Sequence, residues 1–158
     1  MKSKFPNSIF ILVGYGEELP ELLQLRRHLQ LDDNVVFVGP KTQVEVASLL
    51  NRCTVFALPS LSEGFPTSVL EAMSCRKPVV VSSGIGLEEV VADAGLYAQP
   101  RNPRALAEAI VRVLSNRKLA IDLGRRGRDR ILKHYSWTQV VAAIDLLFHK
   151  AVEQRNVR

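Results

Sequence analysis

Cysteine, histidine and aromatic residues are scarce in this 158-residue sequence, and each shortage excludes a class of protein. Two cysteines, Cys53 and Cys75, make no disulfide framework and have no C-x-x-C spacing, so we interpret them as small apolar residues in a reducing, cytoplasmic compartment. The three histidines are scattered, without acidic or cysteine partners at ligand spacing, so no metal site is expected. Aromatic residues at 6% provide no stacking platform for single-stranded nucleic acid.

Long apolar runs are also missing. None approaches the roughly 20 residues that a membrane-spanning helix needs. The N-terminal apolar stretch lacks an A-x-A-like cleavage site and runs into a glycine turn, which predicts a strand rather than a signal peptide. Since no repeat, low-complexity tract or linker is visible, the length predicts a single domain over residues 1–158.

The net charge of +5 comes from basic residues late in the chain. No helix-turn-helix or zinc pattern accompanies them, so nucleic acid is not expected as a partner. A solvated helix face is the simplest interpretation, and peripheral contact with an anionic membrane surface stays open as an alternative. The residues concerned are Arg117, Lys118, Arg125, Arg126, Arg128, Arg130 and Lys133.

Short apolar, β-branched runs alternate with segments of helical periodicity. The predicted strands are Ser8–Val13, Asn34–Val38, Thr54–Leu58, Pro78–Ser82 and Gly95–Ala98. The predicted helices are Glu18–Leu29, Gln43–Asn51, Thr67–Ser74, Leu87–Ala92, Pro103–Ser115, Lys118–His134 and Thr138–Glu153. Strands that are apolar on both faces indicate an α/β fold, a doubly wound, mostly parallel sheet with helices on both faces. Ligands of such sheets bind in the loops at the carboxyl ends of the strands.

Two of those loops carry candidate ligand-binding residues. Gly14 and Gly16 let backbone amides approach a phosphate, but Leu19 replaces the third glycine of a dinucleotide fingerprint, so NAD binding is not supported. In the other loop Glu63 precedes a predicted helix, and Glu71 lies about one turn inside it. The first amides of that helix, those of Thr67 and Ser68, are predicted to be free for a diphosphate. Two carboxylates at this spacing suit hydroxyl groups on two parts of one elongated ligand.

The second loop and its helix contain E-G-F-x-x-x-x-L-E-A-M, from Glu63 to Met73. This string resembles the signature of glycosyltransferase family 4, among the proteins called glycosyl transferases group 1. Five further segments and the late Ser136-Trp137 pair resemble the same family, so the resemblance covers nearly the whole chain. The segments are Phe10–Glu18, Val35–Gly39, Val55–Ser60, Lys77–Ser82 and Glu88–Val91.

The resemblance implies the C-terminal lobe of a GT-B enzyme, which has two Rossmann-like lobes facing across a cleft. This lobe binds a UDP-, GDP- or ADP-sugar, and the enzyme transfers the hexose with retention, normally without an essential metal or other cofactor. Glu63 would contact the sugar as the catalytic carboxylate, and Glu71 would bind the ribose hydroxyls. The other implied donor-binding residues are Gly14, Gly16, Gly39, Pro40, Lys41, Gly64, Phe65, Pro66, Thr67 and Ser68.

The sequence departs from the family pattern in several places. There is room for only one lobe, so an N-terminal acceptor lobe or partner subunit is expected elsewhere. The usual Arg and Lys pair that neutralises the diphosphate is not identifiable, and one lost charge-stabilising donor costs on the order of 3–4 kcal/mol in catalysis. We therefore expect the chain alone to be inactive as a transferase. Arg76 replaces a glycine expected in a left-handed helix cap, and Pro66 removes an amide.

The family's first strand of this lobe is also missing, and it would lie between Ser8–Val13 and Thr54–Leu58. We predict that these two strands pair directly or that another chain fills the slot, as in a strand-swapped homodimer. Two other functions stay open. One is a non-catalytic, degenerate GT-B module that acts in assembly or membrane association; the other is a different GT-B enzyme, such as an epimerase or a phosphorylase.

Overall fold

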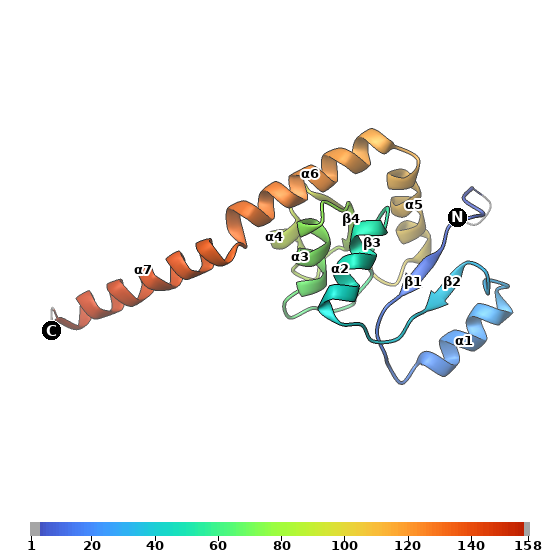
Figure 1. Ribbon diagram of the computed structural model, residues 1–158, viewed down its shortest axis with the longest axis horizontal. Helices are drawn as coiled ribbons and strands as arrows, with labels where there is room; N and C mark the ends of the chain where they lie inside the picture. Colours follow the sequence, from blue (N-terminus) through green and yellow to red (C-terminus); the bar gives the residue numbers. More distant parts are fainter. Residues whose placement is uncertain (1–3, 157–158) are drawn as a thin grey trace. The chain divides into compact units, whose positions relative to one another are not determined.

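The computed structural model describes residues 4–156, and no helix in that range is long and apolar enough to cross a membrane. The chain forms two compact units, Met1–Arg52 and Cys53–Arg158, and each is described by itself. All the predicted strands and helices are present within three residues of their expected ends; strands and helices alternate as far as α5, and α6 and α7 follow (Figure 1). The α/β prediction with parallel strands is therefore confirmed. The prediction of one domain stays a prediction.

The first unit is a two-stranded parallel sheet with two helices. Its elements are β1 (Phe10–Leu12), α1 (Leu19–His28), β2 (Val35–Phe37) and α2 (Gln43–Arg52). Phe10 lies opposite Val35 in the register. Asn34 is buried just before β2, and its Nδ2 donates to the carbonyl oxygens of Pro6 at 2.8 Å and Ser8 at 3.0 Å. This side chain therefore ties the segment before β1 to the start of β2.

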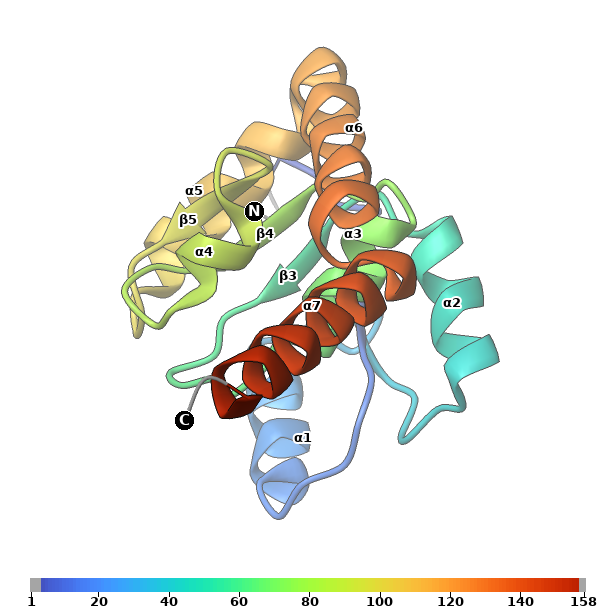
Figure 2. The same ribbon diagram turned by 90° about the vertical axis from the view of Figure 1, so that its left-hand side faces the viewer.

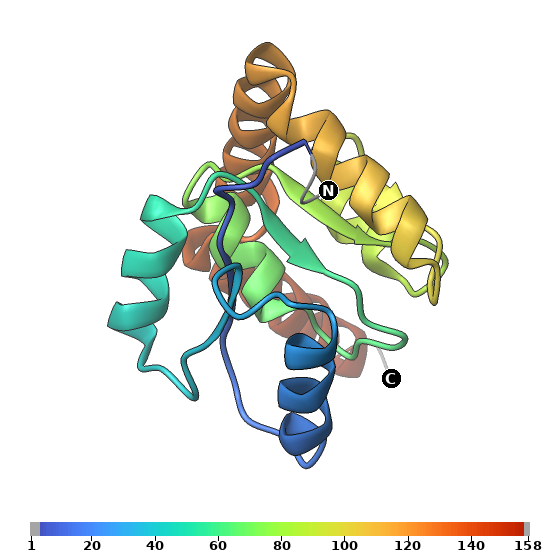
Figure 3. The same cartoon turned by 90° about the vertical axis from the view of Figure 1, so that its right-hand side faces the viewer.

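The second unit is a three-stranded parallel sheet in the order β3-β4-β5, followed by three helices. Its elements are β3 (Phe56–Leu58), α3 (Thr67–Ser74), β4 (Val79–Ser82), α4 (Leu87–Val91), β5 (Gly95–Ala98), α5 (Pro103–Leu114), α6 (Arg117–His134) and α7 (Trp137–Asn156). The central strand β4 is buried along its whole length, as its valines on both faces predict. Figures 2 and 3 view the unit from opposite sides, with α4 nearer in the first and α5 nearer in the second.

Helix α3 packs closely against α6 at two glycines. A Cβ atom placed on Gly124 would lie 2.2 Å from the carbonyl oxygen of Arg76, just beyond the end of α3. One placed on Gly127 would lie 3.3 Å from Cγ of Met73, which is fully buried on α3. The first distance leaves no room for a side chain, whereas the second is a tight but adjustable contact. The glycines of α6 thus let the C-terminal end of α3 approach the α6 backbone.

The left-handed cap predicted at Arg76 is present. Arg76 has φ +57°, and its amide donates to the carbonyl of Met73 at 3.0 Å. The amide of Lys77 donates to the carbonyl of Ala72 at 3.0 Å, which completes a Schellman motif. Arginine therefore occupies a backbone conformation that glycine adopts without strain.

We expect Arg76→Gly to stabilise the second unit by about 1 kcal/mol, because it relieves the left-handed strain of a residue with a Cβ atom. The greater flexibility of glycine in the unfolded chain offsets part of this gain. Urea denaturation of the two proteins measures the difference. Arg112→Gly, inside α5, is the matched control and should destabilise the chain, since glycine in a helix interior is unfavourable. If the Arg76→Gly protein is less stable than the wild type, the inference that Arg76 is strained in the left-handed conformation is wrong.

The predicted direct pairing of the first and third strands would join the two units, and it stays a prediction. Among residues 4–156, β1 is hydrogen-bonded to β2, and β3 is hydrogen-bonded to β4. Each of these strands therefore pairs, within its own unit, with the next strand along the chain, as parallel βαβ connections favour. The alternative, that another chain supplies a strand, stays a prediction.

Part of the basic cluster on α6 has a structural role. Arg125 pairs with Asp122 at 3.1 Å and Asp129 at 3.2 Å on the same helix. The guanidinium of Arg130 donates to the carbonyl oxygens of Val90 at 2.8 Å and Glu89 at 2.5 Å, so it holds the end of α4. The simple interpretation as a solvated face is therefore incomplete.

Candidate functional site

Three loops meet at one edge of the sheet in the second unit. Because β3, β4 and β5 run parallel, their carboxyl ends share an edge, and the loops 59–66, 83–86 and 99–102 all begin there. Ser83 joins two of them, since its amide donates to the carbonyl of Ala98 at 2.9 Å. This is the edge at which ligands bind to open α/β sheets.

The first loop places Glu63 through a hydrogen bond within the loop. The Oγ atom of Ser60 donates to Oε1 of Glu63 at 2.5 Å, and both residues are half-buried. Pro66, at the end of the loop, is buried, whereas Phe65 beside it is 61% exposed. Pro66 therefore fixes the entry into α3, and the ring of Phe65 stays open to a ligand.

The first turn of α3 was predicted to offer two free amides, and it offers one. The Thr67 amide donates to the carbonyl of Phe65 at 2.9 Å, so the prediction for Thr67 is wrong. The cause is the tight turn at Pro66, which brings the two groups together. No acceptor for the Ser68 amide is found in the described chain. Pro66 is the N-cap residue of α3, and its side chain has no atom that could accept a hydrogen bond from this amide. Ser68 is therefore the amide that an anion could reach.

Glu71 lies one helical turn beyond the start of α3. It is three residues from Ser68 and four from Thr67, so the three side chains share one face of the helix. The opposite face carries Val69, Ala72 and Met73, all fully buried. Core packing thus holds α3 in place and leaves the half-buried Glu71 at the surface of the unit.

A carboxylate that the sequence did not single out caps the second loop. Oε1 of Glu88 accepts the amide of Gly84 at 2.5 Å, and this backbone hydrogen bond holds the pKa of Glu88 below its usual value. Gly84 and Gly86 both have positive φ, as this turn requires. The sequence does contain a pattern that could have indicated this cap: two glycines, Gly84 and Gly86, stand just before a helix whose first turn contains Glu88.

The predicted turn residues of the first unit also come together. The Gly14 amide donates to the carbonyl of Gly39 at 3.0 Å, and both glycines have positive φ. Apart from each glycine and its two chain neighbours, no atom of residues 4–156 lies within 4 Å of a Cβ placed on Gly14, Gly16 or Gly39, so their turns are open. The two predicted turns therefore lie together at the carboxyl ends of β1 and β2; they are Gly14–Gly16 and Gly39–Lys41.

Lys41 is held by the N-terminus of α2. Its Nζ lies 3.7 Å from Oε1 of Glu45, and Oε2 of Glu45 accepts hydrogen bonds from the amide of Thr42 at 2.9 Å and its Oγ1 at 2.8 Å. Thr42 and Glu45 form a capping box, and the bonds from Thr42 hold the pKa of Glu45 below its usual value. The ion pair with Glu45 thus holds the ammonium group of Lys41 close to the turn that follows β2.

Candidate metal ligands do not gather in the described part of the chain. No group of three histidine, cysteine or acidic residues that could hold an ion is found there. Cys53 and Cys75 are free and half-buried. The absence of a metal requirement stays a prediction.

Known proteins share this arrangement of strands, loops and helices. The family model described as "Glycosyl transferases group 1" matches residues 1–130. The chain belongs to the glycosyl transferases group 1 family. It is 36% identical over 79% of its length to N,N'-diacetylbacillosaminyl-diphospho-undecaprenol alpha-1,3-N-acetylgalactosaminyltransferase of Campylobacter jejuni, of which it covers 33%. The chain thus spans about a third of the length of this curated relative.

Two solved structures show the same fold. Sucrose-phosphate synthase from Thermosynechococcus elongatus is 29% identical, with a TM-score of 0.82 over 91% of this chain and 38% of that one. The Anabaena HepE protein, solved in complex with UDP-glucose, is 25% identical, with a TM-score of 0.79 over 92% of this chain and 41% of that one. As a glycosyl transferases group 1 protein, this chain therefore has the fold expected from its sequence.

Proposed function

We propose that the chain is the C-terminal, nucleotide-sugar-binding lobe of a retaining glycosyltransferase of family 4 that transfers a hexose. One observation carries the proposal. The loop 59–66 and α3 place Glu63, the free Ser68 amide and Glu71 along one strand–loop–helix unit at the ligand edge of a parallel sheet. The three groups follow one another as a carboxylate, an amide that could bind an anion and a second carboxylate. This order suits a ligand in which a sugar, a diphosphate and a ribose follow one another.

Each part of the unit suits one part of the donor. Glu63 is the acceptor for sugar hydroxyls, because its Oε2 has no hydrogen-bond partner among the described residues. The Ser68 amide and the positive end of the α3 dipole suit the diphosphate. Glu71 is the acceptor for the two ribose hydroxyls, since an ionised carboxylate takes a pair of donors on its two oxygens. No metal enters this scheme.

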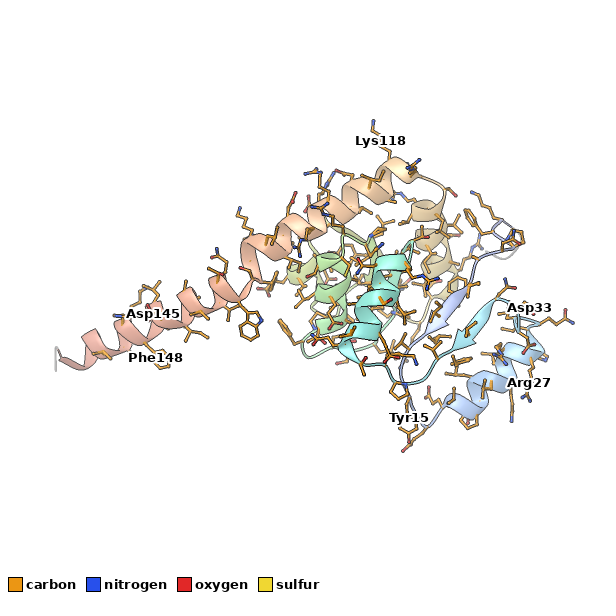
Figure 4. All side chains as sticks on the ribbon, in the orientation of Figure 1. Tyr15, Arg27, Asp33, Lys118, Asp145 and Phe148 are labelled. Atoms are coloured by element: carbon orange, nitrogen blue, oxygen red, sulfur yellow. The ribbon has the colours of Figure 1, made fainter. Side chains whose placement is uncertain are left out.

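The rest of the proposal concerns the whole protein. An acceptor lobe or partner subunit would complete the enzyme, because the chain spans about a third of the curated relative described above. That relative is named for an acceptor linked to diphospho-undecaprenol, a lipid carrier. Peripheral membrane contact in the cytoplasm is consistent with α6, whose seven basic and two acidic residues carry the whole net charge of +5. Lys118 stands at the exposed start of that helix (Figure 4).

Calorimetry with UDP, GDP and ADP and with UDP-glucose, GDP-mannose and ADP-glucose tests the proposal. We expect one nucleotide to bind, and its sugar conjugate to bind more tightly, because Glu63 adds contacts to the sugar. The monophosphate of the nucleotide that binds, UMP, GMP or AMP, is the matched control and should bind at least about tenfold more weakly than its diphosphate if the Ser68 amide contacts the second phosphate. Absence of binding by all six compounds would overturn the proposal.

A further inference from the structure

The scheme above gives Ser60 no role toward the donor, although its hydroxyl is bonded to the carboxylate of Glu63. Oγ of Ser60 donates to Oε1 of Glu63 at 2.5 Å. No other hydrogen bond and no ion pair of Glu63 is found in residues 4–156. The position of the carboxylate within its loop therefore depends on one serine hydroxyl.

The two partners differ in how firmly the fold holds them. Ser60 follows Pro59 directly after β3, which is bonded along its length to the buried strand β4; the Phe56 amide also donates to the carbonyl of Pro78 at 3.0 Å. Glu63 comes three residues later, between exposed neighbours such as Leu61, which is 53% exposed. Ser60 thus lies close to the carboxyl end of β3, and its hydroxyl connects the carboxylate of the more exposed part of the loop to that end of the sheet.

The hydrogen bond uses only part of the carboxylate. An ionised Glu side chain has two oxygens with about four acceptor positions in total. Ser60 occupies one position on Oε1, so Oε2 stays available to a ligand hydroxyl. Because the hydroxyl fixes the Glu63 side chain before a ligand arrives, less rotamer freedom is lost on binding.

We propose that Ser60 is a positioning residue that holds Glu63 for the sugar of the donor, so that it sets how much the sugar adds to donor affinity. This proposal rests on the proposed function, since it requires a nucleotide sugar in the site. Ser60 contacts Glu63 and acts on the ligand only through it. The effect is therefore confined to the sugar and does not extend to the nucleotide.

The test is calorimetry of Ser60→Ala, Ser60→Thr and Ser62→Ala with the nucleotide diphosphate that binds the wild type and with its sugar conjugate. We expect Ser60→Ala to weaken binding of the nucleotide sugar about three- to tenfold, because the Glu63 side chain then loses its rotamer freedom only when the sugar binds, and to leave the diphosphate unchanged. Ser60→Thr keeps a hydroxyl at the same position and should restore most of the affinity. Ser62→Ala makes the same chemical change at an exposed neighbour without a hydrogen-bond partner in the described chain and should change neither affinity.

A double-mutant cycle separates positioning from loop stability. If Ser60 acts through Glu63, then Ser60→Ala adds no further loss in a Glu63→Ala background, which has no acceptor for the Ser60 hydroxyl. Equal weakening of the diphosphate and the nucleotide sugar, or full additivity in the cycle, would overturn the proposal. A wild-type chain that binds neither compound would instead refute the proposed function, so the two failures are distinguishable.

Discussion

Replacing Gly124 with alanine is expected to destabilise the second unit by about 2 kcal/mol or more. The added methyl group would lie 2.2 Å from the carbonyl oxygen of Arg76, a backbone atom that cannot rotate away. Alanine gains about 1 kcal/mol over glycine in a helix interior, but moving α6 away from α3 costs more than this because it opens a gap beside the buried Met73. Thermal unfolding should show a midpoint lower by roughly 4–8 °C.

Gly127→Ala is the matched control, because it places the same methyl group on the same helix one turn away. Its nearest neighbour is Cγ of Met73 at 3.3 Å, an atom of a flexible side chain that can shift by a few tenths of an ångström. The helix gain and the tight contact should nearly cancel, so its midpoint should stay close to that of the wild type. A Gly124→Ala protein as stable as Gly127→Ala would show that the C-terminal end of α3 does not need its close approach to α6.

Glu71→Ala is expected to weaken binding of the donor nucleotide by about 100-fold. The carboxylate is proposed to accept two hydrogen bonds from ribose hydroxyls, and each bond to a charged group contributes about 1.5 kcal/mol or more. Glu71→Gln keeps one good acceptor and should show a smaller loss, about tenfold. Calorimetry with the nucleotide diphosphate measures the change, since the ribose is present with or without the sugar.

Glu108→Ala provides the control for charge. Glu108 is an exposed carboxylate on α5 that pairs with Arg104 at 3.0 Å, so its removal changes the net charge equally without touching the proposed site. It should leave the nucleotide affinity unchanged. The 2′-deoxy nucleotide gives a second check, because it should bind the wild type more weakly and bind Glu71→Ala no differently from the ribonucleotide. Unaltered affinity of Glu71→Ala would remove Glu71 from the site.

The fold was predictable because its strands are short apolar runs that end in glycine, proline or serine. The run Val79–Ser82 is apolar on both faces and became the buried central strand of the second unit. The left-handed turn at Arg76 was also predictable, since a helix ends there and the chain turns back into β4. Within each unit the pairing joins strands that are neighbours along the chain, as short parallel βαβ connections favour. Pairing between β1 and β3 could not be predicted from strand positions, because it depends on how the two units pack together.

The candidate site was predictable as a set of positions and less so as a set of bonds. Glu63 and Glu71 lie on the loop and helix that the sequence indicated. The bond from the Thr67 amide to Phe65 was missed because it depends on the turn angles at Pro66. The Ser60–Glu63 bond was missed although S-x-x-E is a recognisable pattern, the same one that Thr42 and Glu45 use as a capping box. The S-x-x-E pattern usually marks the first turn of a helix. Ser60 and Glu63 both lie before α3, which begins at Thr67, so the pattern was not interpreted as a hydrogen bond.

The proline at the start of α3 has a consequence for turnover. Pro66 has no amide and the Thr67 amide is already bonded, so the first turn of the helix offers Ser68 alone to the diphosphate. In a transferase the nucleoside diphosphate is also the leaving product. With one amide of this turn at the diphosphate, the proposed ribose contact of Glu71, which donor and product share, would carry more of the affinity of both compounds. An enzyme built on this lobe would therefore be inhibited by its own nucleoside diphosphate, and release of that product could limit its turnover.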